Sequence, residues 1–523
     1  MSLSPRRFLP RTVVALTLLG AGVAVSPPAA SAAPTASAAA RAAAPAVSWA
    51  ACTEEDLTGY DCASYEVPLD HDEPRGTTTT IALARRPAGD PAARIGTIFV
   101  NPGGPGGAGR GMVTVAASLV GPDVLARFDI VGFDPRGIGA SDPLQCFATD
   151  AEAEALLARI SGVPLTKAQI SETLRANHAY TEGCERNAGP LLTHMSTLNV
   201  VKDLDLLRQG VGDKRLNYIG YSYGTLIGAT YANVFPGKVR AVVIDGNVDP
   251  DQRTNRRLAN KFDRAGGFEI ALGGFLAECD KAGAACAFSG DARGKFDRLR
   301  ERFRQGPIES PAFGTVTIDD FTSFVASTMY DLAAFPEAAE ILQTVYAEAF
   351  GGDVPLRANR GLKLPQAPSG RGWFSDYLYN GNDAGFAVNC ADAPLPRNPA
   401  LYPGFAKAFE AAHRTFGRAE AFSEVGCANW PRVSERYNGP WNRRTAATVL
   451  VVNPTHDPAT RYSFARNMTR ELGNARLLTL DGFGHTSSFS SCVTHWYSRY
   501  LIEGEVPPAG TRCAQDRAPF PAS

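Results

Sequence analysis

The chain has 523 residues, of which 44% are hydrophobic and 20% charged, and its formal net charge is −1. A surface this close to neutrality lacks the excess of Lys and Arg that neutralises nucleic-acid phosphates, so we expect no nucleic-acid partner. The length leaves room for one large or two moderate globular domains.

The first 46 residues predict an export signal and a leader that precede the folded protein. Arg6, Arg7 and Arg11 come before an uncharged apolar run over 12–25, and small residues end the segment at Ala32, which is the pattern of a signal peptide over 1–32. The run of about 14 residues is shorter than the roughly 20 that a membrane-spanning helix needs, and no comparably long run follows. Residues 33–46 are mostly Ala and predict a disordered leader or pro-segment. We therefore expect a secreted, extracellular protein without a membrane span; the twin-arginine and general secretory routes both remain open.

The cysteines predict disulfides. There are ten of them, an even number, in a chain that the signal directs to an oxidising compartment. Neither a Cys-x-x-Cys pair nor a His-Glu-x-x-His motif occurs, so we expect no metal site. The cysteines fall into neighbouring couples along the chain, which we predict to pair as Cys52–Cys62, Cys146–Cys184, Cys279–Cys286, Cys390–Cys427 and Cys492–Cys513.

Apolar, β-rich runs alternate with helix-like stretches, which is typical of a mostly parallel sheet covered by helices. The predicted strands are residues 95–101, 128–133, 216–220, 239–245, 447–453 and 476–480. Between 251 and 435 this alternation gives way to helical stretches such as 262–282 and 321–349. We therefore predict an α/β core in two parts, residues 47–250 and 436–523, with a mainly helical cap inserted over 251–435.

A glycine-rich loop follows the first of these strands. Four of the seven residues over 101–107 are glycine, a density that would destabilise a helix or a strand. The loop lacks the Gly-Lys-Ser/Thr ending of a phosphate-binding P-loop and only loosely resembles a dinucleotide-binding turn. A plain flexible turn remains an alternative. We interpret the loop as a source of backbone N–H donors, with Gly104 as one half of an oxyanion hole.

The candidate nucleophile lies in the pentapeptide Gly220-Tyr221-Ser222-Tyr223-Gly224. This G-x-S-x-G pattern is weak by itself, because a Gly-Ser turn can be purely structural. Here it joins the predicted strand 216–220 to a helix-like stretch over 226–234, which is the strand–turn–helix context of a nucleophile elbow. We predict Ser222 as the nucleophile and the N–H of Tyr223 as the second oxyanion donor.

An acid and then a histidine are expected to follow such a serine. Asp457 comes after the predicted strand 447–453, at the sheet edge, where a carboxylate can orient an imidazole; it could also cap a helix. His485 follows the strand 476–480 through a glycine-rich turn. His456 is the remaining rival as the base, although its neighbour Asp457 better fits the place of the acid. We predict that Asp457 and His485 complete a triad with Ser222.

Several motifs together resemble one family. They are residues 101–106, 134–141 (Asp-Pro-Arg-Gly-Ile-Gly-Ala-Ser), 220–224 and 387–392. With the placement of the cysteines, they make the chain similar to the proline-iminopeptidase-like serine peptidases, and more closely to the secreted tripeptidyl aminopeptidases, from about residue 49 to 513. The resemblance implies an α/β-hydrolase fold with a helical cap, no cofactor, and peptide substrates with a free N-terminus. It carries the triad and oxyanion roles to the residues already named, and leaves Arg136 as a structural residue that ties loops together.

One position departs from this resemblance. An aminopeptidase must pair the ammonium group of its substrate with carboxylates. The resemblance implies a glutamate just before the cysteine at Cys390, where this chain has Asn389. Asp392 and Asp331 are the candidate substitutes, although each could instead be a surface or capping residue.

The leading hypothesis is a secreted serine exopeptidase that releases short peptides, specifically tripeptides, from free N-termini through an acyl-enzyme. The alternative is a secreted carboxylester or amide hydrolase that acts on small molecules, because the same triad cleaves either bond and the cap decides between them. A catalytically dead binding protein on this scaffold would require a broken triad, and the sequence contains none.

Overall fold

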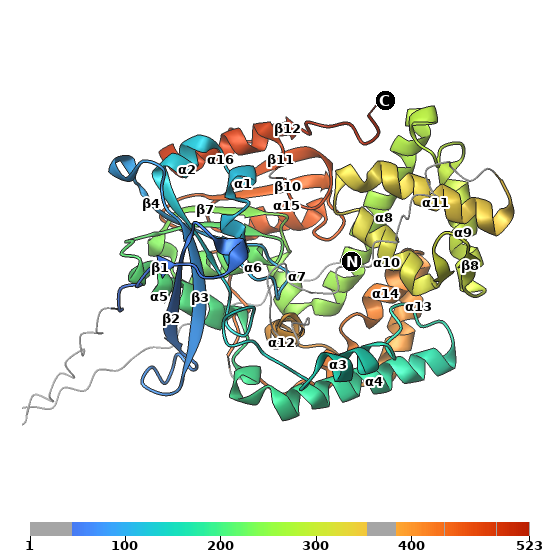
Figure 1. Ribbon diagram of the computed structural model, residues 1–523, viewed down its shortest axis with the longest axis horizontal. Coiled ribbons are helices and arrows are strands. Elements are labelled where there is room, and N and C mark those ends of the chain that lie inside the picture. Colours follow the sequence, from blue (N-terminus) through green and yellow to red (C-terminus); the bar gives the residue numbers. More distant parts are fainter. Residues whose placement is uncertain (1–43, 353–382, 434, 488, 522–523) are drawn as a thin grey trace, which may run out of the picture. The chain divides into compact units, whose positions relative to one another are not determined.

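The computed structural model describes residues 44–352, 383–433, 435–487 and 489–521 (Figure 1). The predicted signal peptide over 1–32 and residues 33–43 of the predicted leader lie outside these ranges. The last leader residues, in contrast, belong to the fold. The Tyr65 hydroxyl donates to the carbonyl of Pro45 (3.0 Å), and the Val47 N–H donates to the carbonyl of Gly210 (2.9 Å).

The described residues form one large sheet and one small hairpin. The strands are β1 (Ala50–Ala51), β2 (Asp61–Pro68), β3 (Thr78–Arg86), β4 (Gly96–Asn101), β5 (Phe128–Phe133), β6 (Leu216–Tyr221), β7 (Val239–Asp245), β8 (Ile308–Ser310), β9 (Gly314–Val316), β10 (Val449–His456), β11 (Ala475–Phe483) and β12 (Arg512–Ala514). The large sheet has ten strands in the order β1-β2-β3-β5-β4-β6-β7-β10-β11-β12, and β8 pairs with β9. The pairs from β5–β4 to β11–β12 are parallel, whereas β1, β2 and β3 are antiparallel additions at one edge.

All six predicted strands are confirmed, with shifts of one to three residues at some ends. They are the parallel strands at the centre of the sheet, and β4, β5 and β6 are buried along their whole length. Strands covered on both faces have continuous apolar sequences, which is why they were recognisable. The antiparallel edge strands β1 to β3 and the short strand β12 were not predicted.

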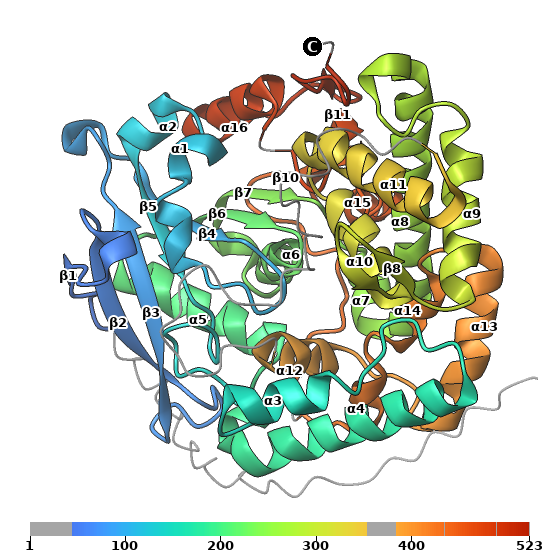
Figure 2. The same cartoon turned by 45° about the vertical axis from the view of Figure 1, so that its right-hand side comes forward.

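Helices cover both faces of this sheet. On one face, α1 (Ala116–Leu119), α2 (Pro122–Arg127) and α16 (Ser491–Glu503) pack on one set of alternating strand residues (Figure 2). On the other face, α5 (Thr197–Gly210), α6 (Gly224–Val234) and α15 (Tyr462–Glu471) pack on the alternate set. This three-layer arrangement is the α/β-hydrolase fold that we predicted, with the carboxyl ends of the parallel strands along one edge.

The predicted cap is mainly helical over its described residues and also contains the β8–β9 hairpin. Its helices are α7 (Pro250–Asn255), α8 (Arg257–Ala282), α9 (Ala292–Arg304), α10 (Ile318–Thr328), α11 (Phe335–Phe350), α12 (Asp383–Asp392), α13 (Tyr402–Ala412) and α14 (Gly417–Phe422). The predicted helical stretch 321–349 is divided between α10 and α11, and α11 begins with a proline at its second position. Proline has no N–H to donate and is tolerated only in the first turn of a helix, so a continuous helix could not pass through Pro336.

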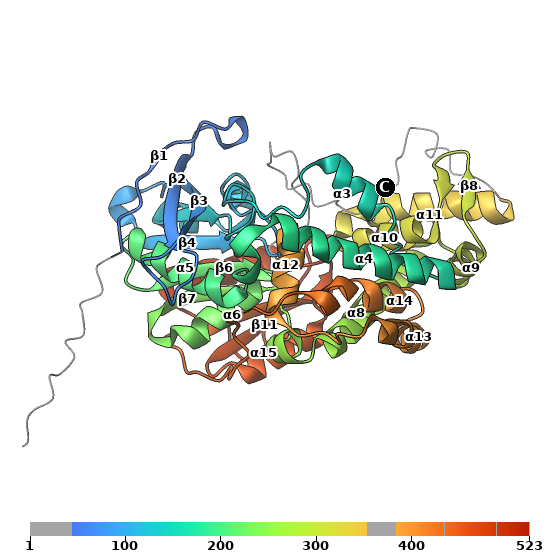
Figure 3. The same ribbon diagram turned by 90° about the horizontal axis from the view of Figure 1, so that it is seen from below.

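A segment that we assigned to the core packs both with the core and with the cap. Helices α3 (Asp150–Leu157) and α4 (Lys167–Asn187) lie between β5 and β6 in the chain. Ile170 and Leu174 of α4 join an apolar cluster with Tyr402 and Phe409 of α13, and α4 runs past α12 and α14 in Figure 3. The layer of helices beside the sheet is therefore built from two insertions rather than one.

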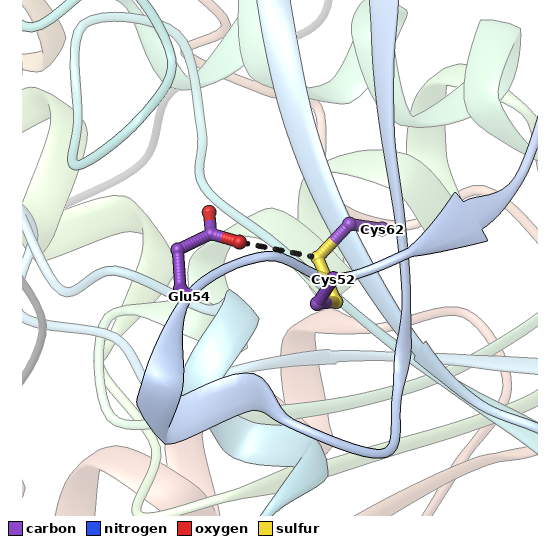
Figure 4. Close-up of side chains that lie close together, drawn as sticks. All are labelled: Cys52, Glu54 and Cys62. Atoms are coloured by element: carbon purple, nitrogen blue, oxygen red, sulfur yellow. Dashed lines mark hydrogen bonds between the residues drawn. A yellow bond between two sulfur atoms is a disulfide. The ribbon is translucent and has the colours of Figure 1, made fainter.

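The five predicted disulfide pairings are confirmed. Sulfur–sulfur distances are 1.92 to 2.04 Å for Cys52–Cys62, Cys146–Cys184, Cys279–Cys286, Cys390–Cys427 and Cys492–Cys513. Glu54 lies beside the first pair, with Oε2 3.9 Å from Cys62 Sγ (Figure 4). These three side chains resemble a set of metal ligands, but the two sulfur atoms are bonded to each other and are not thiolates. None of the helices in the described ranges combines the length and the apolar composition of a membrane-spanning segment.

Candidate active site

Ser222 lies in a sharp turn between β6 and α6. Its φ is +55°, a left-handed value that is uncommon for residues other than glycine and is often found at functional sites. Glycine is required on both sides of Ser222 because neighbouring atoms leave no room for a Cβ. A Cβ on Gly220 would lie 2.4 Å from the Gly224 carbonyl, and one on Gly224 would lie 2.8 Å from Asn101 Oδ1. The predicted strand–turn–helix is confirmed, and its backbone geometry is that of a nucleophile elbow.

Asp457 and His485 form a hydrogen-bonded pair at the same sheet edge. Nδ1 of His485 lies 2.9 Å from Asp457 Oδ2 and 3.0 Å from Oδ1. Asp457 is 1% exposed, and its Oδ1 also accepts from the N–H groups of Ala459 (3.0 Å) and Thr460 (2.7 Å). These donors fix the carboxylate in a turn rather than at a helix end. Because Nδ1 is committed to Asp457, Nε2 is the ring nitrogen available to exchange a proton.

The rival histidine points elsewhere. The ring of His456 stacks on Phe483, with centroids 4.4 Å apart, and its Nδ1 lies 3.2 Å from Thr455 Oγ1. Burial lowers the pKa of His456, so it is an unprotonated packing residue near neutral pH. His485 instead follows β11 through Gly484, whose φ is +98°. The main-chain N–H of His485 donates to the Tyr330 carbonyl (2.9 Å).

The glycine-rich loop after β4 lies against the Ser222 turn. Gly103 donates to Asn101 Oδ1 (3.0 Å), and the N–H of Gly107 donates back to the Gly103 carbonyl (3.1 Å). The contact is close, since a Cβ on Gly103 would lie 2.9 Å from the Tyr223 nitrogen. Among the turn and loop hydrogen bonds of the described residues, none uses the N–H of Gly104 or Tyr223. Gly104 and Tyr223 therefore stay the predicted oxyanion donors.

Gly103→Ala should lower kcat by roughly 10²- to 10³-fold, the usual cost of losing one oxyanion donor. Gly103 has φ +92°, and an added Cβ would lie 2.3 Å from the Tyr221 carbonyl, so the loop must shift away from the Ser222 turn. Gly59→Ala is the matched control, because Gly59 has φ +90° but nothing within 4 Å of an added Cβ. Steady-state kinetics and thermal unfolding of both variants check this. Equal activity losses in the two would mean that backbone strain, and not the loop position, is responsible.

Comparison with known proteins agrees with this geometry. The family model described as TAP-like protein matches residues 413–513, and the one described as alpha/beta hydrolase fold matches 96–305. The chain is 31% identical to serine protease Hip1 of Mycobacterium tuberculosis, over 89% of this chain and 91% of that protein. It is 30% identical to the tripeptidyl aminopeptidase of Streptomyces lividans, over 88% of this chain and 84% of that protein. The chain belongs to the tripeptidyl aminopeptidase family. It is a serine hydrolase, and it is also 32% identical to carboxylesterase B of Mycobacterium tuberculosis, over 97% of this chain and 99% of that protein.

Arg136 ties loops of this family member together, as predicted. Its buried guanidinium donates to both oxygens of Asp203 on α5, at 2.7 and 2.6 Å. It also donates to the carbonyls of Pro68 (3.0 Å) and Leu69 (2.7 Å) at the end of β2. These contacts join the loop after β5 to α5 and to the end of β2. Arg136 therefore has a structural role.

The two candidate ammonium ligands have different surroundings. Asp392 is 2% exposed, and its oxygens accept from the N–H (2.8 Å) and the hydroxyl (2.6 Å) of Thr197. The Thr197 hydroxyl also bonds to the Tyr223 hydroxyl, so Asp392 anchors the residue next to the nucleophile. These contacts argue against Asp392 as a ligand for a substrate. Asp331 is exposed, caps Ala333 (2.8 Å), and directly follows Tyr330, whose ring packs edge-on against His485.

A buried cluster of charges in the cap was not predicted. Arg257 Nε donates to Glu424 Oε2 (2.7 Å), and Lys261 lies 2.9 Å from Glu424 Oε1. Arg264 pairs with Glu420. Burial alone would raise the pKa of Glu424, yet Arg257 and Lys261 hold it well below its usual range. Every carboxylate in this cluster is already paired with a cation, so the cluster offers no ready counter-charge to an incoming ammonium group.

The position that departs from the family resemblance adjoins this cluster. Asn389 Oδ1 accepts from Arg253, and more distantly from Arg257 (3.4 Å). Arg253 is 3% exposed, its guanidinium lies 5.8 Å from the centre of the Tyr223 ring, and burial lowers its pKa to about 10. Asn389 therefore serves as a neutral acceptor for buried arginines.

Proposed function

We propose that this protein is a secreted serine exopeptidase that releases short peptides, above all tripeptides, from free N-termini. The observation that carries the proposal is the His485–Asp457 pair beside the strained Ser222 turn and the glycine-rich loop. The tripeptidyl aminopeptidase and serine protease among the relatives favour peptide substrates. The five disulfides favour an extracellular location.

In the proposed mechanism, Ser222 Oγ attacks the scissile carbonyl while His485 Nε2 takes its proton. Asp457 holds the imidazole through Nδ1 and stabilises the imidazolium that forms. The N–H groups of Gly104 and Tyr223 bind the developing oxyanion. The imidazolium then protonates the leaving amine, and water, activated by His485, hydrolyses the acyl-enzyme and restores Ser222.

For the free N-terminus we propose Asp331 as the ammonium ligand. It is exposed, and it adjoins Tyr330, which contacts His485 through both its ring and its carbonyl. An exposed carboxylate at this position can meet the end of a peptide whose scissile bond lies at Ser222. Asp392, by contrast, is withdrawn from this role by its bonds to Thr197.

A second candidate function is hydrolysis of small carboxylesters or amides. Its support is the charge-paired cluster around Glu420 and Glu424, in which every carboxylate already has a cation, together with the carboxylesterase among the relatives. The triad geometry serves either bond, so the choice between the two functions depends on the cap.

Chromogenic amides of one, two and three residues with free N-termini should separate these functions. We expect kcat/KM to rise with length and to be at least tenfold higher for the tripeptide than for the single residue, because remote contacts contribute to transition-state binding. A short-chain nitrophenyl ester is the comparison substrate. Hydrolysis of the ester with no measurable cleavage of any peptide amide would replace the peptidase by the second candidate.

A further inference from the structure

The end of β7 contacts all three segments that carry the proposed triad. The main-chain carbonyl of Asp245 accepts the Ser222 N–H at 2.9 Å. The next residue, Gly246, donates to the carbonyl of Val452 (3.0 Å) on β10, the strand that leads to Asp457. Gly246 has φ +72°, and an added Cβ would lie 3.3 Å from His485 Cε1. The backbone over 245–246 therefore lies between the nucleophile turn, the acid strand and the histidine.

The Asp245 side chain extends the same connection. Its Oδ2 accepts from the N–H of Ser487 (2.8 Å), two residues after His485, and from the hydroxyl of Tyr497 on α16 (2.8 Å). One residue thus bonds to the Ser222 turn through its backbone and to the His485 turn through its carboxylate.

The charge of this carboxylate is not explained by its hydrogen bonds. Asp245 is 0% exposed, and both of its side-chain donors are neutral groups that an amide oxygen would satisfy equally well. Burial, together with a smaller contribution from the charge of Asp457, raises the pKa of Asp245 to about 7. The titratable groups that face it are Tyr497, which also faces Tyr221 on β6, and Asp457 with its partner His485. A buried acid without a cation costs stability, so its retention here calls for a function.

We propose that Asp245 is a positioning residue for hydrolysis: it holds the Ser222 and His485 turns in register, and its negative charge favours the imidazolium that forms on His485. This inference rests on the proposed triad. Asp245 should raise the pKa of His485, because a nearby anion stabilises the protonated, positively charged imidazole. Removing the charge therefore lowers the pKa of His485.

Asp245→Asn keeps an acceptor for Ser487 and Tyr497 but removes the charge. We expect kcat to fall by roughly 3- to 100-fold with little change in KM, as for other losses of positioning. The acidic limb of kcat/KM should move to lower pH by about a few tenths of a unit, because Asp245 with a pKa of about 7 is already partly protonated there. The measurement is the pH profile of the purified full-length enzyme on its best chromogenic substrate.

Asp134→Asn is the matched structural control. Asp134 is also a buried aspartate that follows a parallel strand, and it accepts from the N–H groups of Gly109 (2.7 Å) and Ala140 (2.9 Å) in loops outside the triad segments. This variant should lose stability and keep the wild-type acidic limb. An equal shift in both variants, or no shift in a folded Asp245→Asn enzyme, would overturn the proposal.

Tyr497→Phe provides a test that does not depend on the folding of an Asp245 variant. It keeps the carboxyl group but removes a donor that favours its ionisation, so the pKa of Asp245 should rise and less negative charge should face His485. The acidic limb should therefore move to lower pH, in the same direction as for Asp245→Asn. A Tyr497→Phe enzyme with an unchanged limb would also contradict the proposal. Failure of the triad itself would be recognised separately, as activity that survives Ser222→Ala.

Discussion

Replacing Ser222 with alanine should lower turnover by roughly four to six orders of magnitude while the protein stays folded, because members of a triad act as a unit. The turn itself does not depend on the hydroxyl. It is held by main-chain bonds from the Ser222 N–H to Asp245 (2.9 Å) and from the Thr225 N–H to the Ser222 carbonyl (2.9 Å), which alanine retains. Initial rates of the purified variant measure the loss of turnover, and its thermal unfolding checks that the fold is intact.

A fluorophosphonate probe identifies the reacting serine directly. It should label the peptide that contains Ser222 in the wild type and leave the Ser222→Ala variant unlabelled. Ser118→Ala, at an exposed position of α1, is the control and should keep full activity and labelling. Labelling of another serine, or measurable turnover by Ser222→Ala at more than a few per cent of the wild-type rate, would refute the assignment.

The sequence was most informative where local constraints coincide. Ser222, Asp457 and His485 each follow a mainly apolar run that becomes a parallel strand, buried in full or in part, so their place at the carboxyl edge could be predicted. Glycines mark the positions where the backbone must be left-handed or must approach another segment, as at Gly103 and Gly220. The disulfides could be paired because each joins cysteines that are neighbours in the order along the chain.

Contacts between distant segments left no comparable signal. Arg257 pairs with Glu424 across 167 residues, and Asp392 bonds to Thr197 across 195. Nothing in the local pattern around Asp392 distinguishes a buried acid that anchors Tyr223 from an acid that awaits a substrate. The same limit applies to α4, whose apolar residues pack partly in the core of the sheet and partly on α13.

A tripeptide amide with a free N-terminus should be hydrolysed roughly tenfold to a few hundredfold faster than its acetylated twin. Acetylation removes the positive charge, so the carboxylate that the bound peptide covers is left without a partner, a loss of about 1 to 3 kcal/mol. The measurement is the ratio of kcat/KM for the two substrates at neutral pH. Equal rates on both would end the aminopeptidase proposal and leave the ester or small-amide hydrolase in its place.

The Asp331→Asn variant tests whether Asp331 is the residue responsible for this preference for the free N-terminus. The amide can still cap Ala333 through its oxygen but no longer offers a charge to ammonium, so the ratio should fall towards one while the acetylated peptide and a simple ester react as before. Asp291→Asn is the matched control, because Asp291 is also an exposed capping aspartate in the cap, at the start of α9. If the ratio is large in the wild type and survives in Asp331→Asn, the free N-terminus is recognised by another carboxylate. A fall in both variants would instead indicate a general effect of surface charge, which added salt should abolish.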